Sequence, residues 1–120
     1  MPTNSATAAA VAEVCNGFYN TNDKVDCMMK LRDANIAANV MPICRGFYNN
    51  SDKLDCLMKL NQKTVLDDLV GVCQQFYNNN DKLSCLQQLA GLYIPKDIIT
   101  LCSQYYNNTD KVSCLLKFKR

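Results

Sequence analysis

Eight cysteines at one regular interval constrain the fold of this chain more than any other feature. They occur at 15, 44, 73 and 102 and again at 27, 56, 85 and 114, so each series advances by 29 residues without an insertion. The surrounding segments repeat as well: VCNGFYNTNDKVDCMMKL, ICRGFYNNSDKLDCLMKL, VCQQFYNNNDKLSCLQQL and LCSQYYNNTDKVSCLLKF. A fixed period of this length is typical of stacked-repeat proteins. We therefore expect a single repeat domain over residues 1–120, with repeats at about 5–33, 34–62, 63–91 and 92–120.

The first part of each repeat carries apolar residues at helical spacing. In the third repeat these are Val65, Leu69, Val72, Cys73 and Phe76. Steps of four, three, one and three place such side chains on one stripe of a helix. The pattern predicts a long first helix in every repeat, beginning near residues 7, 36, 65 and 94.

Three residues bear on where these first helices begin. Thr64, followed by Asp67, resembles a capping box. Pro95 suits the first turn of a helix. Pro42 falls inside the predicted helix of the second repeat, where it should cause a kink because it removes a backbone hydrogen bond.

An asparagine-rich turn follows each first helix, and a second helix follows the turn. We expect this second helix to be the shorter one. Its predicted N-caps are short polar residues whose side-chain oxygen can accept a backbone N–H, and the next residue is always an aspartate, which suits the first turn. The predicted caps are Asn22, Ser51, Asn80 and Thr109, and the aspartates are Asp23, Asp52, Asp81 and Asp110.

The turn decides how the cysteines pair. In one continuous helix Cys15 and Cys27 would lie roughly 18 Å apart, whereas a disulfide needs Cα atoms within about 7 Å. In an antiparallel hairpin they lie side by side, since each is six residues from the turn at residue 21. Pairing between repeats would leave Cys15 and Cys114 unpaired. We therefore predict an all-α, right-handed α-solenoid-like stack of four helical hairpins, with disulfides Cys15–Cys27, Cys44–Cys56, Cys73–Cys85 and Cys102–Cys114.

The composition argues against several classes of function. The net charge is only +2, so the basic excess of a nucleic-acid-binding protein is missing, and no apolar stretch is long enough to predict a membrane span. There is no histidine, and no two cysteines are closer than twelve positions, so we expect no metal site. With no histidine base, a single glutamate (Glu13) and cysteines used as staples, we expect neither enzyme activity nor a cofactor.

Cysteine usage also bears on the compartment. An even number of regularly spaced cysteines favours an oxidising environment, so we expect a secreted, periplasmic or cell-surface protein. The first ten residues lack the features of a signal peptide, which suggests a mature domain that begins at an added Met1. The alternative is a cytosolic protein with eight free thiols.

The turn of each repeat brings an aromatic and a cationic residue to one edge of the predicted stack. This ladder could bind a repetitive ligand, such as a polymer or an extended peptide. Residues shared by all repeats more often serve the fold, and then tyrosine would pack over the turn while lysine pairs with a carboxylate. The recurring lysine is the part that folding explains least, because a cation in a first turn opposes the helix dipole. The candidate binding residues are Tyr19, Lys24, Tyr48, Lys53, Tyr77, Lys82, Tyr106 and Lys111.

Several functions are compatible with this architecture. The first is an exported binding module that presents an extended surface to a protein or polymeric ligand. The second is a structural module that self-associates through its end faces, and the third is a helical protein that holds lipid. An engineered repeat scaffold also fits the pattern. The motifs at Asn49 and Asn107 match N-glycosylation sites but arise from the same turn.

The fourth repeat contains more apolar residues than its own hairpin can bury. An exposed patch of this kind usually marks an interaction site. We expect it to form a homodimer about a two-fold axis, since such closed dimers are the commonest assembly. The residues concerned are Ile98, Ile99, Leu101, Tyr105, Leu115, Leu116 and Phe118.

Overall fold

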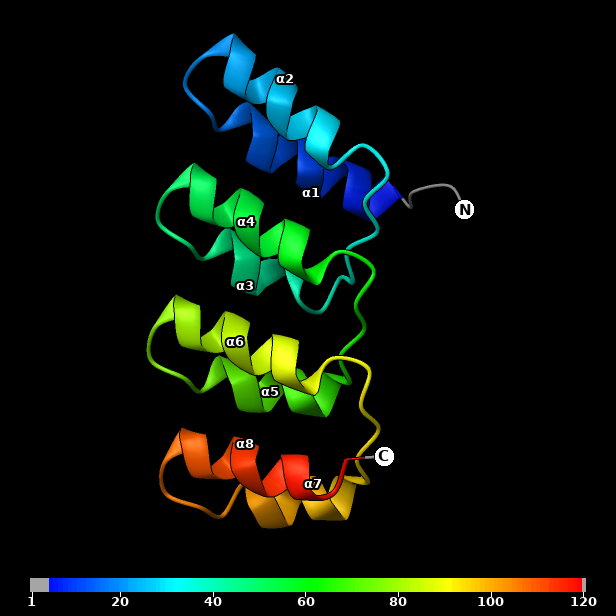
Figure 1. The fold of residues 1–120 in the computed structure, drawn as a ribbon, viewed down its shortest axis with the longest axis vertical. Coiled ribbons are helices and arrows are strands. Elements are labelled where there is room, and N and C mark those ends of the chain that lie inside the picture. The colour runs from blue at the N-terminus through cyan, green and yellow to red at the C-terminus, as the bar shows by residue number, and fades with distance from the viewer. Residues whose placement is uncertain (1–4, 120) are drawn as a thin grey trace. The chain divides into compact units, whose positions relative to one another are not determined.

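The computed structural model describes the backbone of residues 5–119 and the side chains of residues 7–119. Over this range the protein is all-α, with eight helices and no strand (Figure 1). The helices are α1 (Ser5–Asn16), α2 (Thr21–Lys30), α3 (Met41–Arg45), α4 (Asn50–Leu60), α5 (Asp67–Gln74), α6 (Asn79–Leu89), α7 (Lys96–Cys102) and α8 (Asn108–Lys117).

The chain divides into two compact units, Met1–Lys63 and Thr64–Arg120. Each unit contains two helical hairpins, α1–α2 with α3–α4 in the first and α5–α6 with α7–α8 in the second. In the first unit α1 packs against α4 of the next hairpin, and in the second unit α5 packs against α7 and α8. The division between units lies within one residue of the predicted boundary between the second and third repeats. That all four repeats form a single domain stays a prediction.

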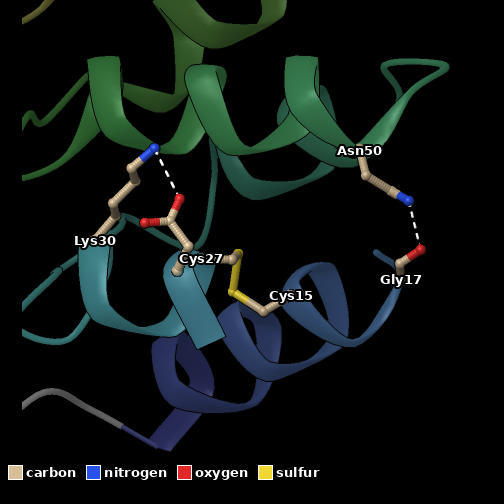
Figure 2. The surroundings of a disulfide bond; sticks show 6 residues. Cys15, Gly17, Cys27, Lys30 and Asn50 are labelled. Carbon is tan, nitrogen blue, oxygen red and sulfur yellow. Dashed lines mark hydrogen bonds and ion pairs between the residues drawn. A yellow bond between two sulfur atoms is a disulfide. The ribbon is translucent and has the colours of Figure 1, made fainter. Parts of the chain in front are cut away.

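Every hairpin is closed by its own disulfide, with the pairing that the turn symmetry predicts. The four bridges join Cys15 to Cys27, Cys44 to Cys56, Cys73 to Cys85 and Cys102 to Cys114. The paired Cα atoms lie 5.3 to 5.5 Å apart. Figure 2 shows the first bridge between α1 and α2. No cysteine remains free within the described residues.

Leucines of the second helices α4 and α6 lie at the centre of the core. Leu57 and Leu60 of α4 and Leu86 and Leu89 of α6 have no exposed surface. Steps of three residues keep each pair on one helical face. Burying a leucine side chain contributes roughly 1.5–3 kcal/mol, so these positions supply much of the stability of the short helices.

The prediction that the first helix of each hairpin is the longer one is wrong in three hairpins. Helices α3, α5 and α7 contain 5, 8 and 7 residues, whereas their partners α4, α6 and α8 contain 11, 11 and 10. Ile36, Val65 and Ile94 precede these helices in irregular segments, yet they are almost fully buried. The helical spacing correctly indicated which residues are buried. It did not show that they lie on a helix, because a side chain of an irregular segment can also be buried in the core.

The start signals of the first helices also need correction. Helix α3 begins at Met41, so Pro42 lies in its first turn and breaks no intrahelical hydrogen bond. Thr64 does not cap α5, because Leu66 is the N-cap and makes no side-chain capping bond. Pro95 is the N-cap residue of α7 and lies one place before its first helical residue.

The N-caps of the second helices lie two residues earlier than the sequence predicts. They are Asn20, Asn49, Asn78 and Asn107, and the side-chain oxygen of each accepts a hydrogen bond from the backbone N–H of the aspartate three residues later. An asparagine with extended backbone angles can bond the third N–H of a helix, whereas residues 22, 51, 80 and 109 are already helical.

Polar contacts between hairpins recur at equivalent positions of the two units. Asn50 Nδ2 donates to the Gly17 carbonyl in the first unit, at 2.5 Å (Figure 2). Asn108 Nδ2 donates to the Gln75 carbonyl in the second, at 2.9 Å. Lys111 Nζ also donates to Gln75 Oε1 at 2.7 Å. Within each unit, therefore, the end of one first helix is bonded to the start of the next second helix.

The linkers that follow the second and third hairpins are each held by a backbone hydrogen bond to the preceding linker. Gln62 N–H donates to the Asn35 carbonyl at 2.9 Å, and Gly91 N–H donates to the Thr64 carbonyl at 2.7 Å. Both residues have a positive φ, 63° at Gln62 and 77° at Gly91. Glycine adopts this conformation freely, but a glutamine there is strained.

Candidate binding surface at the hairpin loops

In the α3–α4 loop one aromatic side chain is buried and the next one is exposed. Phe47 is 7% exposed, whereas the adjacent Tyr48 is 98% exposed. The following residue, Asn49, has extended backbone angles and caps α4. The phenylalanine therefore anchors the loop, whereas the tyrosine ring projects into solvent.

All four loop tyrosines share this exposure. Tyr19 and Tyr77 are 99% exposed, and Tyr106 is 100% exposed. The interpretation that tyrosine packs over the turn is therefore wrong. An aromatic ring in water gains nothing from folding, because burial of its apolar surface is what stabilises the folded state. The fold does not explain why these four positions are tyrosine.

The lysines of the same repeats lie one helical turn inside the second helices. Lys24, Lys53, Lys82 and Lys111 are all half-buried. None of them forms an ion pair with a carboxylate among residues 7–119, where the ion pairs involve Lys30, Arg32, Arg45 and Lys59. The predicted lysine–carboxylate pairing is therefore not seen in the described part of the chain. Lys111 instead donates to the side chain of Gln75.

The aspartates beside these lysines have a structural role. In the first and third hairpins the capping contact is reciprocal, since Asn20 Nδ2 donates to Asp23 Oδ2 at 3.0 Å and Asn78 Nδ2 donates to Asp81 Oδ2 at 2.9 Å. The carboxylate also lies in the first helical turn, where the helix dipole favours a negative charge. The loop thus has a fixed backbone from which the tyrosine projects.

Within each unit the two loops lie on the same side. Figure 1 shows the α1–α2 loop next to the α3–α4 loop in the first unit, and the α5–α6 loop next to the α7–α8 loop in the second. Each unit therefore presents two exposed tyrosines along one edge. Asn49 and Asn107, which match the glycosylation pattern, are the helix caps of this edge.

The described residues hold no cluster of three or more acidic, cysteine or histidine side chains that could bind a metal ion. None of the described helices combines the length and the apolar character needed to cross a bilayer. Comparison with known proteins adds no assignment. No family model, curated protein or solved structure matches this chain.

Two apolar grooves add to the candidate surfaces. One lies on the α1–α2 hairpin and includes Val25 and Met28. The other lies on the α7–α8 hairpin and includes Leu101, Tyr105 and Phe118. The sequence indicated the second groove through the apolar excess of the fourth repeat, although Ile99 and Leu115 of that set are buried. The sequence did not indicate the first groove.

Proposed function

We propose that this protein is a binding module whose hairpin loops present exposed tyrosines to an extended ligand, either a protein segment or a polymer. The observation that carries the proposal is the exposure of all four loop tyrosines, at 98% or more. Tyrosine offers a rigid apolar ring with a polar hydroxyl, which makes it one of the residues most enriched in binding surfaces. The half-buried lysine of each repeat adds a positive charge near the same edge.

Repetition is what makes an extended ligand the best fit. A ligand that contacts one loop and reaches a second binds the second site intramolecularly, which raises the overall affinity without any new type of contact. Since each unit has two such loops on one side, a repeating ligand is favoured over a compact one. The cysteines serve as staples in this proposal, and no catalytic role is assigned to any residue.

The experiment is a binding assay of the oxidised protein on an array of immobilised polysaccharides and extended peptides, each in a short and a long form. We expect at least one long form to bind more tightly than its short form. Replacing the four loop tyrosines together by serine should abolish this binding. Because these side chains make almost no contact with the fold, the helical circular dichroism and the melting temperature should stay nearly unchanged.

Tyr93→Ser supplies the matched control. Tyr93 is 63% exposed and lies outside the hairpin loops, so its removal should leave binding intact. If the fourfold variant binds every probe as tightly as the wild type, the loop tyrosines are not the binding surface. If the fourfold variant unfolds, the tyrosines stabilise the fold, and the premise that they make almost no contact with it is wrong.

The proposal extends to the compartment and to the assembly of the hairpins. Four disulfides support export to an oxidising environment, where such bonds persist. The repeated hairpin contacts within each unit support hairpin stacking, and we propose that the stack continues through all four hairpins as a right-handed solenoid-like array, as predicted from the sequence period. Continuity of the stack would place all four loops along one edge.

A further inference from the structure

The first hairpin exposes apolar residues at positions that are buried in the next hairpin. Val25 and Met28 of α2 are 52% and 46% exposed. Their counterparts 29 residues later, Leu54 and Leu57 of α4, are 8% and 0% exposed. Helix α4 is the helix on which α1 packs. The outer face of α2 thus has the character of a hairpin interface without a neighbouring hairpin.

The fourth hairpin also exposes an apolar residue at a position that is buried in other hairpins, in this case on its first helix. Leu101 of α7 is 54% exposed. The residues at the same repeat position in α1 and α5, Val14 and Val72, are 4% and 2% exposed. Helices α1 and α5 are those that pack on the next hairpin, through α4 and α8 respectively. The outer face of α7 is therefore the other half of the same interface.

The polar groups at the two faces match a contact that the chain already makes. In the second unit Lys111 Nζ donates to Gln75 Oε1 at 2.7 Å. The residues at these two repeat positions in the terminal hairpins are Lys24 and Gln104. Lys24 lines the groove on the α1–α2 hairpin, and Gln104 lines the groove on the α7–α8 hairpin. Both partners of the contact are thus present, Lys24 on the first hairpin and Gln104 on the fourth.

We infer that the α7 face of one copy of this chain packs on the α2 face of a second copy, in the way that α1 packs on α4 and α5 packs on α8. The occupant is a second copy because the two grooves are the two halves of an interface that the chain forms once in each unit. Different faces meet in this contact, so each added copy leaves one free face of each kind, and the assembly grows as an open chain unless it closes into a ring.

This association is distinct from the two-fold dimer predicted from the fourth repeat alone. A two-fold dimer would pair α7 with α7 and leave α2 uninvolved. It is also independent of the loop tyrosines. A failure of polymer binding would leave it standing, and a failure of self-association would leave the tyrosine surface standing.

Sedimentation velocity of the oxidised chain over a range of concentrations tests the inference. We expect the mean mass to rise steadily with concentration. Met28→Asp and Leu101→Asp should each reduce the association constant at least about tenfold, because a charge would be buried without a partner. Met58→Asp is the matched control, since Met58 is 46% exposed like Met28 but lies on the second hairpin; it should leave the association unchanged.

Mixing the two disrupted variants gives the sharpest distinction. The Met28→Asp chain retains an unmodified α7 face, and the Leu101→Asp chain retains an unmodified α2 face. The mixture should therefore form a one-to-one pair with the wild-type association constant and stop there. A mixture that stays monomeric would overturn the inference, as would a Met28→Asp variant that associates like the wild type.

One substitution should strengthen the contact. The donors to the inter-hairpin carbonyls are Asn50 and Asn108, but the residue at this position of the first hairpin is Thr21. Thr21→Asn would restore the longer donor opposite the Gln104 carbonyl. It should raise the association constant about three- to tenfold, the factor expected for one net hydrogen bond. No increase, with an unchanged melting temperature, would show that the two faces do not meet in this register.

Discussion

Removing one disulfide should cost a large part of the stability of its hairpin. We consider Cys73→Ala with Cys85→Ala, which opens a loop whose ends are 12 residues apart. The chain-entropy relation gives about 3 kcal/mol for a loop of this size. The two side chains are 0% and 1% exposed, so losing both sulfurs from the core adds about 1–2 kcal/mol. The expected loss in free energy of unfolding is therefore about 4–5 kcal/mol.

This loss is large relative to what the helices can supply. Helix α5 has 8 residues and α6 has 11, and isolated helices shorter than about 12–15 residues are marginal in water. Urea unfolding followed by circular dichroism measures the change. The pair Cys15→Ala with Cys27→Ala is the matched comparison, with the same separation and two fully buried side chains, and it should cost a similar amount. A loss below about 1 kcal/mol in both variants would refute the argument that the bridges hold the hairpins.

Three smaller predictions concern the turns, each measured as the free energy of urea unfolding. Asn78→Ala should destabilise by about 1 kcal/mol because Asn78 caps α6, whereas Asn80→Ala should stay within about 0.5 kcal/mol; equal losses would contradict the observed cap. Gln62→Gly should stabilise by about 1 kcal/mol because it relieves a positive φ of 63°, and a loss would show that the glutamine is not strained. Tyr48→Ser should change stability by less than about 0.5 kcal/mol, since its ring is 98% exposed; a larger loss would mean that the ring packs on the fold.

The hairpins and their disulfides could be predicted because they depend only on where the cysteines and the turn lie in the sequence. Cysteines that are equidistant from a turn must meet if the two flanking segments are antiparallel helices. The helix bounds could not be predicted as well. Ile36 and Val65 have helical spacing, but they reach the core from irregular segments. The spacing of apolar residues indicates which side chains point into the core. It does not determine whether the backbone at those residues is helical or irregular.

The caps were misplaced for a related reason. Two polar residues in each turn can accept a backbone N–H, and the sequence alone does not show which of them stays outside the helix. The asparagine after each tyrosine does so. The exposure of Tyr19 and its counterparts could therefore not be predicted from the repeat, since invariance is compatible with packing and with binding.

The exposed grooves of the terminal hairpins show the same limit. Val25 and Leu101 fit the apolar columns of the repeat as well as Leu54 and Val72 do. Their exposure depends on whether a neighbouring hairpin covers them, which is a property of the assembled fold. The sequence therefore indicated an apolar excess in the fourth repeat but neither its counterpart on α2 nor the match between the two faces.

The central claim is that the four loop tyrosines contact a ligand and do not pack on the protein's own fold. Nitration by tetranitromethane, mapped by mass spectrometry, tests this most directly because it reads each tyrosine separately. In the free protein Tyr19, Tyr48, Tyr77 and Tyr106 should react fastest and at similar rates. Adding the array polymer that binds best should protect these four together while Tyr93 reacts as before. Slow reaction of the loop tyrosines in the free protein, or unchanged reaction in the presence of bound polymer, would contradict the claim.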